Sequence, residues 1–493
     1  MTYSVAIVLI AFAILLLLYA IWIACLILTN HQQKPRPVLI QNDDLIVFAS
    51  QSGQAEYYAR QTAQQLERVG QTMSVVDIQY LTVEQLRAAH KVLWFVSTYG
   101  EGDAPDTARL TIKNIFSDSS LNLSHQSYAI LALGDKRYTH FCRFGQVLDQ
   151  HLQQHQAKAL FKMVCVDHLK QADLNCWTQR LEQLTQQQFT SDQPEQNWHT
   201  FILKNRVCLN TGSQGKPIYQ IQLSYAESTT WSSGDILEVQ CGNRLEDIQA
   251  FSQAQQQIVD GDLLVTLQFK NLRRVPDRGL NESFEEWIQR FDDLAIREYS
   301  IASISEQGGR IELVVRQEIT ATGLGLGSGW LTEYAVLGQN IVARIRSHAT
   351  FHLKPTQKPF ILIGNGTGIA GLVAHLAQRQ QWNEPQNWLI FGERQQQFDH
   401  LYKDQIQLWQ AQGFLPEVDY AFSRDQAEKI YVQHILQQKS EQLLSWIEAG
   451  AAIYVCGSLK GMAQEVEQTL LSLLGAEQLE QLRVEGRYRR DVY

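Results

Sequence analysis

"LIVFASQSGQAEYYARQTAQQLERVG", Leu45–Gly70, is the stretch that decides the fold of the first domain. A short apolar run, Leu45 to Ala49, leads into a loop with two hydroxyls and a glycine, and then into a stretch with helical spacing. This order predicts a buried strand joined to a helix by a turn. Similar apolar runs, "VLWFVS" and "YAILALG", follow with helical stretches between them, so we predict an α/β domain with a parallel sheet.

The segment before this strand has a different composition. From Val5 to Leu28 there is no charged residue, and the run is long enough to cross a bilayer as a helix. Lys34 and Arg36 follow it, which predicts that the later domains face the cytoplasm from the inner, cytoplasmic membrane or its equivalent. A signal peptide is the alternative, but it would need a basic start and a small-residue cleavage site, which the segment lacks.

Changes of composition predict the domain limits. A glutamine-rich stretch without periodicity follows the first α/β domain, then a strand-rich region with turn signals, then a second alternation of strands and helices. The predicted division is a transmembrane anchor at 1–30, a tether at 31–44, the first α/β domain at 45–184, a linker at 185–200, an antiparallel β-barrel at 201–355 and a second α/β domain at 356–493.

Charge and cysteine content exclude several functions. The formal net charge is -9 and no long basic run occurs, so a nucleic-acid partner is not expected. The seven cysteines contain no CxxC pair, which argues against a zinc site and a disulfide framework. We therefore predict free thiols, no metal site, and two or three globular domains after the anchor.

Three loops of the first domain lie where the predicted strands end. They are "SQSGQAE" from Ser50, "STYGEGDAPD" from Ser97 and "ALGDKRYTHFC" from Ala132. The carboxyl ends of strands are where an open α/β sheet binds its ligand. The first loop contains no lysine, so it suits a phosphate monoester held by hydroxyls and amides better than a nucleoside triphosphate.

These loops resemble the FMN site of the flavodoxin-like domains of diflavin reductases, the family of NADPH-hemoprotein reductases and the sulfite reductase flavoprotein. The resemblance implies that Ser50 to Ala55 hold the phosphate and that Tyr99 and Tyr138 flank the isoalloxazine ring. The full implied FMN set is Ser50, Gln51, Ser52, Gly53, Gln54, Ala55, Ser97, Thr98, Tyr99, Gly100, Leu133, Gly134, Asp135, Tyr138, Phe141, Cys142 and Asp167.

In the predicted barrel, "REYSIAS" from Arg297 and "GLGSGWL" from Gly325 resemble the FAD-binding pair of ferredoxin-reductase-like modules. The resemblance places Arg297 at the pyrophosphate, Tyr299 at the flavin and Ser300 near N5. The implied FAD set is Arg297, Glu298, Tyr299, Ser300, Gly325, Leu326, Gly327, Ser328 and Tyr493. Two departures are Ser233, where the family usually has proline, and a connecting segment between Asp247 and Arg297 that is shorter than usual.

The last domain begins with "FILIGNGTGIAGL" from Phe360, a strand followed by a GxGxxG turn. Further on, "FSRDQAEKIYVQ" offers two cations and two hydroxyls, which suit the 2′-phosphate of NADPH. The NADP-binding set that the resemblance implies is Thr367, Ser423, Arg424, Lys429, Tyr431, Gln433 and Cys456.

Four residues are expected at the hydride path. "AIYVCGS" contains Cys456, and the resemblance sets this thiol beside the nicotinamide together with Ser300 and Asp491. In "EGRYRRDVY", Asp491 is expected to steady the positive nicotinamide, and Tyr493 to stack on FAD as a movable cover. The predicted catalytic set is therefore Ser300, Cys456, Asp491 and Tyr493.

The resemblance implies an oxidoreductase that passes electrons from NADPH to FAD, to FMN and then to an acceptor. A haem protein at the membrane is the first choice of acceptor, because the short tether holds the FMN domain near the bilayer. The alternatives are the flavoprotein component of sulfite reductase, with a haemoprotein as acceptor, and a reductase of ferric chelates. A flavin-binding redox sensor with little turnover is the alternative of another class.

Overall fold

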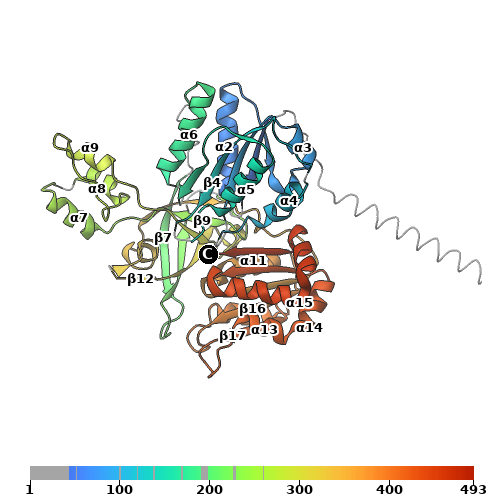
Figure 1. The fold of residues 1–493 in the computed structure, drawn as a ribbon. Coiled ribbons are helices and arrows are strands. Elements are labelled where there is room, and N and C mark those ends of the chain that lie inside the picture. Colours follow the sequence, from blue (N-terminus) through green and yellow to red (C-terminus); the bar gives the residue numbers. More distant parts are fainter. Residues whose placement is uncertain are drawn as a thin grey trace, which may run out of the picture. The chain divides into compact units, whose positions relative to one another are not determined.

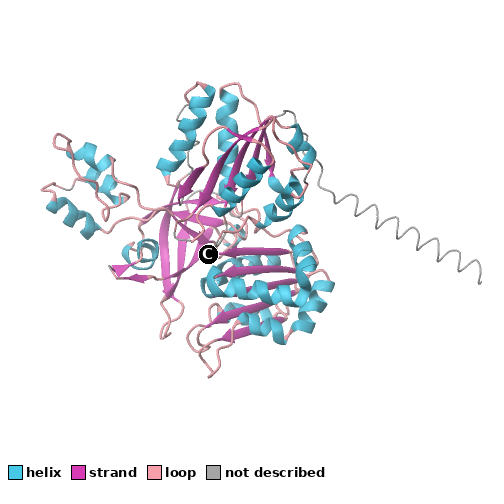
Figure 2. Cartoon of the chain, in the orientation of Figure 1, coloured by secondary structure: helices cyan, strands magenta, loops and turns pink. Residues whose placement is uncertain are grey.

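The computed structural model describes residues 44–50, 53–98, 102–118, 120–136, 139–167, 170–189, 198–225, 229–258, 260–321 and 323–493. The chain forms two compact units that divide mainly between Phe189 and Thr190, although Gly53 and Gln54 group with the second unit, and each unit is described by itself. The first unit contains one parallel sheet, and the second contains an antiparallel six-stranded sheet, a two-stranded hairpin and a parallel five-stranded sheet. Figure 2 colours their strands and the helices around them.

The first unit is built on one parallel sheet in the order β2-β1-β3-β4, with β5 and β6 both paired to β4 (Figure 1). This is the order of a doubly wound sheet whose ligand site lies where β1 and β3 meet. The strands are β1 (Asp44–Ala49), β2 (Ser74–Asp77), β3 (Lys91–Ser97), β4 (Ser127–Gly134), β5 (Lys158–Ala159) and β6 (Val164–Asp167), and the helices are α2 (Gln54–Arg68), α3 (Val83–Ala88), α4 (Asp106–Phe116), α5 (Arg143–Gln154) and α6 (Gln171–Thr185).

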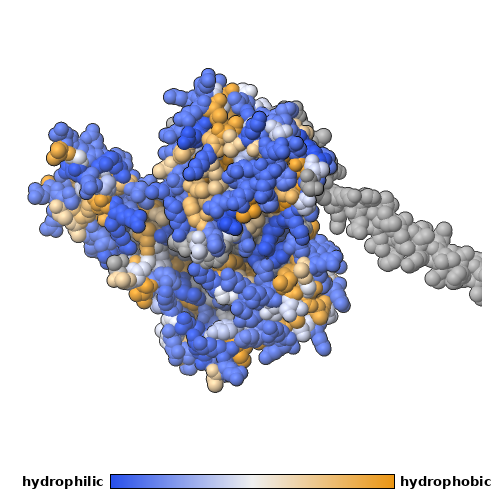
Figure 3. All heavy atoms as spheres, viewed as in Figure 1, coloured by the Kyte–Doolittle hydropathy of each residue, from blue (hydrophilic) through white to orange (hydrophobic). Residues whose placement is uncertain are grey.

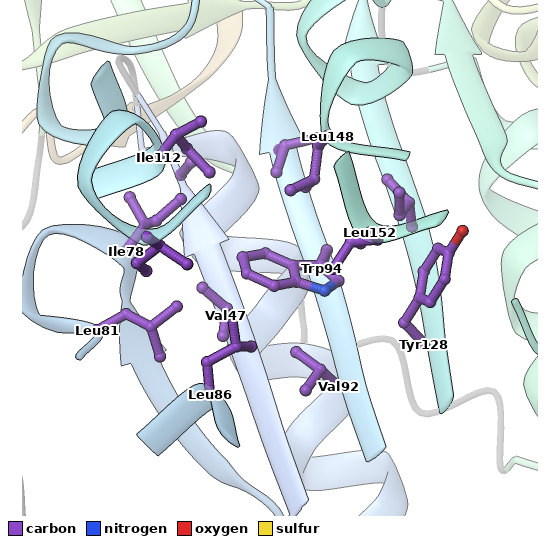
Figure 4. Packing of buried hydrophobic residues seen from close by; sticks show 14 of the residues in the cluster. Val47, Ile78, Leu81, Leu86, Val92, Trp94, Ile112, Tyr128, Leu148 and Leu152 are labelled. Atoms are coloured by element: carbon purple, nitrogen blue, oxygen red, sulfur yellow. The ribbon is translucent and has the colours of Figure 1, made fainter. Parts of the chain in front are cut away.

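Hydrophobic clusters cover both faces of this sheet. Alternate residues of β1 serve the two clusters, since Val47 packs with Trp94 on one face and Ile46 with Phe95 on the other. Figure 4 shows the first cluster, in which Trp94 lies among aliphatic side chains from the strands and covering helices. The outer surface in view is mostly hydrophilic (Figure 3), so the apolar side chains of this unit mainly fill its two cores.

The predicted linker begins later than its composition indicates. Helix α6 ends at Thr185, but Phe189 is buried in the first unit, and its backbone N–H donates to Glu182 Oε1 at 2.9 Å. The first part of the glutamine-rich stretch therefore belongs to the first unit. The next described residue is Trp198, directly before β7.

The predicted anchor and tether lie outside the described residues, apart from Asp44 at the start of β1. None of the helices in the described ranges is long and apolar enough to cross a bilayer. The anchor stays a prediction from sequence.

The second unit opens with an antiparallel sheet in the order β10-β9-β14-β7-β8-β11. An antiparallel bridge between Ile301 and Leu313 joins the two outer strands, so the sheet closes as the predicted barrel does. Its strands are β7 (His199–Cys208), β8 (Ile218–Ser224), β9 (Ile236–Val239), β10 (Arg297–Ser300), β11 (Arg310–Arg316) and β14 (Asn340–Arg346), with a hairpin of β12 (Ile319–Thr320) and β13 (Gly323–Leu324) and the short helix α10 (Leu326–Gly329) beside it.

The shortened connecting segment forms a small helical lobe between β9 and β10 (Figure 1). It contains α7 (Leu245–Ala254), α8 (Gly261–Gln268) and α9 (Phe284–Gln289). Phe284, Trp287 and Phe291 form the centre of its own hydrophobic cluster. The lobe therefore has a core of its own, although it is much shorter than the connecting domain that the resemblance implies.

The last part of the second unit is a parallel sheet in the order β17-β16-β15-β18-β19. The order reverses between β15 and β18, which is where a doubly wound sheet binds its nucleotide. The strands are β15 (Phe360–Asn365), β16 (Asn387–Glu393), β17 (Glu417–Phe422), β18 (Ala452–Gly457) and β19 (Tyr488–Val492), and the helices are α11 (Ile369–Gln381), α12 (Lys403–Ala411), α13 (Val432–Gln438), α14 (Ser440–Glu448) and α15 (Gln464–Val484).

A buried carboxylate joins the barrel to the segment that leads into this sheet. Asp235 accepts hydrogen bonds from Ser232 N at 2.8 Å, His348 N at 3.0 Å and His352 Nε2 at 2.5 Å. Burial alone would raise the pKa of Asp235, but these hydrogen bonds outweigh it and lower the pKa. Asp235 thus remains ionised and fixes the end of the barrel from which the nucleotide-binding sheet starts.

Candidate functional site

Strand β19 sets Asp491 beside Cys456. The strand pairs in parallel with β18, and the register makes Cys456 and Asp491 partners. The pairing continues past the strand, since Tyr493 N donates to Gly457 O at 3.0 Å and Leu459 N donates to Tyr493 O at 3.0 Å. The C-terminal residues from Tyr488 to Tyr493 are therefore held by backbone hydrogen bonds at the ligand-binding end of the sheet.

Asp491 collects two donors from different parts of the unit. Ser300 Oγ, at the end of barrel strand β10, donates to Asp491 Oδ2 at 2.7 Å, and Cys456 Sγ donates to the same oxygen at 3.8 Å. Cys456 is fully buried, and burial together with the Asp491 charge raises the pKa of its thiol. The thiol stays protonated at neutral pH, so the three side chains form one polar group around a single negative charge.

Tyr493 lies over the turn that follows β15. Its hydroxyl donates to Thr367 Oγ1 at 3.2 Å, and the side chain is 52% exposed. A half-exposed ring suits a side chain that moves aside for a ligand. The structure thus brings all four predicted catalytic residues together in one region.

The two predicted FAD motifs also meet. A side chain at Gly327 would collide with Arg297 and come within 2.8 Å of the Tyr299 hydroxyl, so only glycine lets α10 approach β10 this closely. Gly325 N donates to Glu318 O at 2.7 Å, and Ser328 Oγ accepts from Glu318 N at 3.0 Å. These contacts fix the turn at the start of α10 beside Arg297, where the resemblance implies the FAD pyrophosphate.

Glu298, another predicted FAD residue, belongs to a charged network instead of standing free. Arg346 donates to Glu298 Oε2 at 2.8 Å and to the buried Glu238 at 2.6 Å, and Arg344 donates to Glu238 at 2.5 Å. Two arginines and two carboxylates make up this network, so their charges balance. The network ties β14 to β9 and β10 beside Arg297.

The turn after β15 has the close packing that a dinucleotide requires. Gly366 has a φ of +57°, and a side chain at Gly368 would collide with the Cys456 carbonyl. Glycine at these positions lets the turn lie against the end of β18, so a ligand can approach backbone amides. Thr367 stands between them, in contact with Tyr493.

The predicted 2′-phosphate residues follow β17. Ser423 is anchored to the end of β16, since its N–H donates to Glu393 O at 2.9 Å. Arg424, Lys429 and Tyr431 are exposed. Gln433 is buried, and its Oε1 has no hydrogen-bond partner among the described residues. A buried acceptor without a donor fits a ligand that supplies one.

The sequence reasoning missed two arginines at this site. Arg316 ends barrel strand β11, and its guanidinium lies where a side chain at Gly366 would be, 3.5 Å from Glu393. The Arg394 carbonyl accepts from Arg424 N at 2.8 Å. Arg394 could have been found as a cation at a strand end, but only the structure shows that Arg316 reaches across from the barrel.

The described FMN residues gather at the carboxyl edge of the first sheet. Ser50 Oγ accepts from Ala55 N at 3.2 Å at the start of α2, and Ser97 Oγ donates to Ala49 O at 3.2 Å. Thr98 Oγ1 is buried without a partner in the described part of the chain, which fits a ligand at this edge.

The remaining described members come from the ends of neighbouring strands. Leu133 and Gly134 end β4, and Gly134 is the register partner of Asp167 on β6. Asp167 accepts from Lys136 N at 3.0 Å. The other described members are Gly53, Gln54, Asp135, Phe141 and Cys142, and the calls that lie outside the described residues are Gln51, Ser52, Tyr99, Gly100 and Tyr138.

The sequence is similar to those of known proteins. The Flavodoxin family model matches residues 46–176, and that of the Oxidoreductase NAD-binding domain matches residues 362–468. The chain is similar to sulfite reductase [NADPH] flavoprotein alpha-components. It is 28% identical to that of Neisseria meningitidis serogroup C, over 91% of this chain and 89% of the relative. For Vibrio cholerae the figures are 28%, 91% and 87%, and for Buchnera aphidicola 26%, 94% and 91%.

This is the domain set of a diflavin reductase. The chain is an NADPH-dependent diflavin oxidoreductase, with FMN as the cofactor of the flavodoxin domain and FAD and NADPH as those of the second unit. When bound, the nicotinamide would supply hydride chemistry, and the two flavins would supply the link between two-electron and one-electron transfer.

The resemblance gives the residues of this site expected tasks. Ser300 and Cys456 donate to Asp491 and orient its carboxylate, which would place a negative charge where positive charge develops on a bound nicotinamide. Tyr493 would cover the site until the nucleotide enters and so limit access of water. Arg424 and Lys429 would bind the phosphate charge at the far end of the nucleotide.

Replacing Tyr493 by alanine should raise kcat/KM for NADH more than that for NADPH. Either nucleotide must displace the Tyr493 ring before it binds. NADPH offsets the free-energy cost of this displacement through its 2′-phosphate contacts, which NADH lacks. Steady-state kinetics with both nucleotides measure this ratio. Tyr493→Phe is the control, because it keeps the ring and loses only the bond to Thr367. An unchanged ratio in Tyr493→Ala would refute the role of the ring as a cover.

Replacing Arg424 and Lys429 by alanine should raise KM for NADPH and leave NADH kinetics unchanged. Each lost charge-assisted hydrogen bond to phosphate costs about 1.5 to 3 kcal/mol. Arg180→Ala, at an exposed position of α6 in the first unit, is the matched control. Equal effects on both nucleotides would show that these residues do not bind the 2′-phosphate.

Proposed function

We propose that this diflavin reductase is the flavoprotein component of a sulfite reductase. The observation that carries the proposal is the extent of the similarity, which covers 91% of this chain and 89% of the Neisseria meningitidis serogroup C sulfite reductase [NADPH] flavoprotein alpha-component. An alpha-component acts with another component. Electrons that leave FMN would therefore pass to a separate protein.

The tether favours a haem protein at the membrane as the acceptor, but the relatives named above are components of sulfite reductase. A sulfite reductase haemoprotein thus becomes the first acceptor to test. The other acceptors are a membrane haem protein and a ferric chelate. The reconstitution assay below also distinguishes these from a redox sensor with little turnover.

We also propose that the chain is held at the inner membrane by Val5–Leu28, with both units on the cytoplasmic side. The support is the uncharged apolar run and the cations that follow it. Cell fractionation of the full chain and of a variant lacking residues 1–43 tests this. Recovery of the full chain in the soluble fraction, without detergent, would contradict the anchor.

Reconstitution tests the acceptor. Purified full chain with both flavins is mixed with NADPH, sulfite and the haemoprotein component of a bacterial sulfite reductase, and NADPH oxidation and sulfide are measured. We expect NADPH oxidation that requires both proteins and sulfite. If an artificial one-electron acceptor is reduced but sulfite is not, the sulfite reductase assignment is wrong and the other acceptors follow. Negligible turnover with both flavins bound would instead favour the sensor.

A further inference from the structure

Two cysteines of the first unit meet below one of the predicted FMN loops. Cys142 immediately precedes helix α5, and Cys165 lies on β6. Ala132 on β4 connects them, because Cys165 is its register partner and Cys142 Sγ donates to its carbonyl oxygen at 3.3 Å. Both cysteines pack on the same face of the sheet, in the cluster that contains Trp94.

The two thiols also perturb each other's pKa. The neighbouring Cys142 thiol lowers the pKa of Cys165 to about 7, and the neighbouring Cys165 thiol, together with burial, raises the pKa of Cys142. Cys165 is partly exposed, whereas Cys142 is fully buried. One member is therefore an accessible thiolate near neutral pH, and the other is a protonated thiol within its reach.

The pair sits at the base of the predicted cofactor loop. A side chain at Gly134 would meet Cys142 Sγ at 2.9 Å, so Gly134 and Cys142, the two ends of the predicted loop, lie directly against each other. Cys165 is two residues before Asp167, which accepts from Lys136 N in the same loop. A new covalent bond at either sulfur would therefore move residues that contact Gly134 and Lys136, near the start of the loop, as well as Cys142 at its end.

We propose that Cys142 and Cys165 are a peroxide-sensitive pair that closes to a disulfide and thereby loosens FMN binding. The Cys165 thiolate attacks a peroxide oxygen, the O–O bond breaks, and Cys165 becomes a sulfenic acid as hydroxide leaves. The Cys142 thiol then attacks the Cys165 sulfur, the S–S bond forms, the S–O bond breaks, and the Cys142 proton leaves with the hydroxyl as water. The thiols lose two electrons, which the peroxide gains.

The disulfide would alter the loop in two ways. Cys142 would lose the hydrogen that it donates to the Ala132 carbonyl, and its sulfur would be tied to β6 instead. Cys142 has a left-handed backbone conformation, with a φ of 53°, so its position is already restricted. Movement of this residue is therefore transmitted to Gly134 and Phe141, and we expect weaker retention of FMN.

Mass spectrometry of the flavin-loaded full chain tests the proposal without relying on activity. After treatment with a low excess of hydrogen peroxide, peptides containing Cys142 and Cys165 should be recovered linked, and dithiothreitol should separate them. Filtration should show FMN released from the oxidised chain and retained by the reduced chain. Re-reduction with added FMN should restore binding.

Two variants serve as controls. Cys165→Ser should retain FMN after peroxide, because its thiolate is missing. Cys176→Ser should behave like the unchanged chain, because Cys176 packs in the cluster on the other face of the sheet. Absence of the linked peptide, or equal FMN release from Cys165→Ser, would overturn the proposal. A linked peptide with full FMN retention would refute the effect on the cofactor.

Discussion

The parallel pairing of β19 with β18 is the interaction on which the catalytic site depends. Strand pairing fixes residues in register, so a backbone ladder decides that Asp491 faces Cys456. The bond from Ser300 then joins this sheet to the barrel. A carboxylate without hydrogen-bond donors could adopt several rotamers. The Asp491 carboxylate is instead fixed by the strand register and by the donors Ser300 and Cys456.

Close approach between backbone segments also shapes the rest of the second unit. Glycines at 327, 366 and 368 remove side chains where backbone, arginine and ligand must share a small volume. Arg316 reaches from the barrel to the turn at Gly366 and pairs with Glu393, while Arg344 and Arg346 share Glu238 and hold the barrel strands together. The barrel and the parallel sheet therefore act together, and neither contains a complete site.

Much of this could be predicted from the sequence, because the signals are local. Apolar runs followed by glycine and hydroxyl turns indicated strand ends, and both parallel sheets have their ligand loops there. The resemblance to diflavin reductases added residues such as Ser300 and Asp491, which are far apart in sequence but form a hydrogen bond. Periodicity alone could not have paired them.

The features that could not be predicted from the sequence depend on contacts between segments that are distant along the chain. Arg316 looks like an ordinary polar residue at the end of a strand, and only the closed barrel directs it to Gly366. Phe189 lies in a polar stretch but is buried by the first unit. Cys142 and Cys165 do not form a spacing motif, and the β4–β6 register brings them together. In each case tertiary packing overrides the local pattern.

The central claim is that Asp491, held by Ser300 and Cys456, stabilises the charge that develops during hydride transfer. The most direct measurement is the rate of FAD reduction by NADPH in a stopped-flow instrument for Asp491→Asn, with Asp404→Asn on the first turn of α12 as the control. The account predicts a rate lower by about 10²-fold at saturating NADPH, with a larger isotope effect from deuterated NADPH and little change in its dissociation constant. An unchanged rate of FAD reduction in Asp491→Asn would contradict the account.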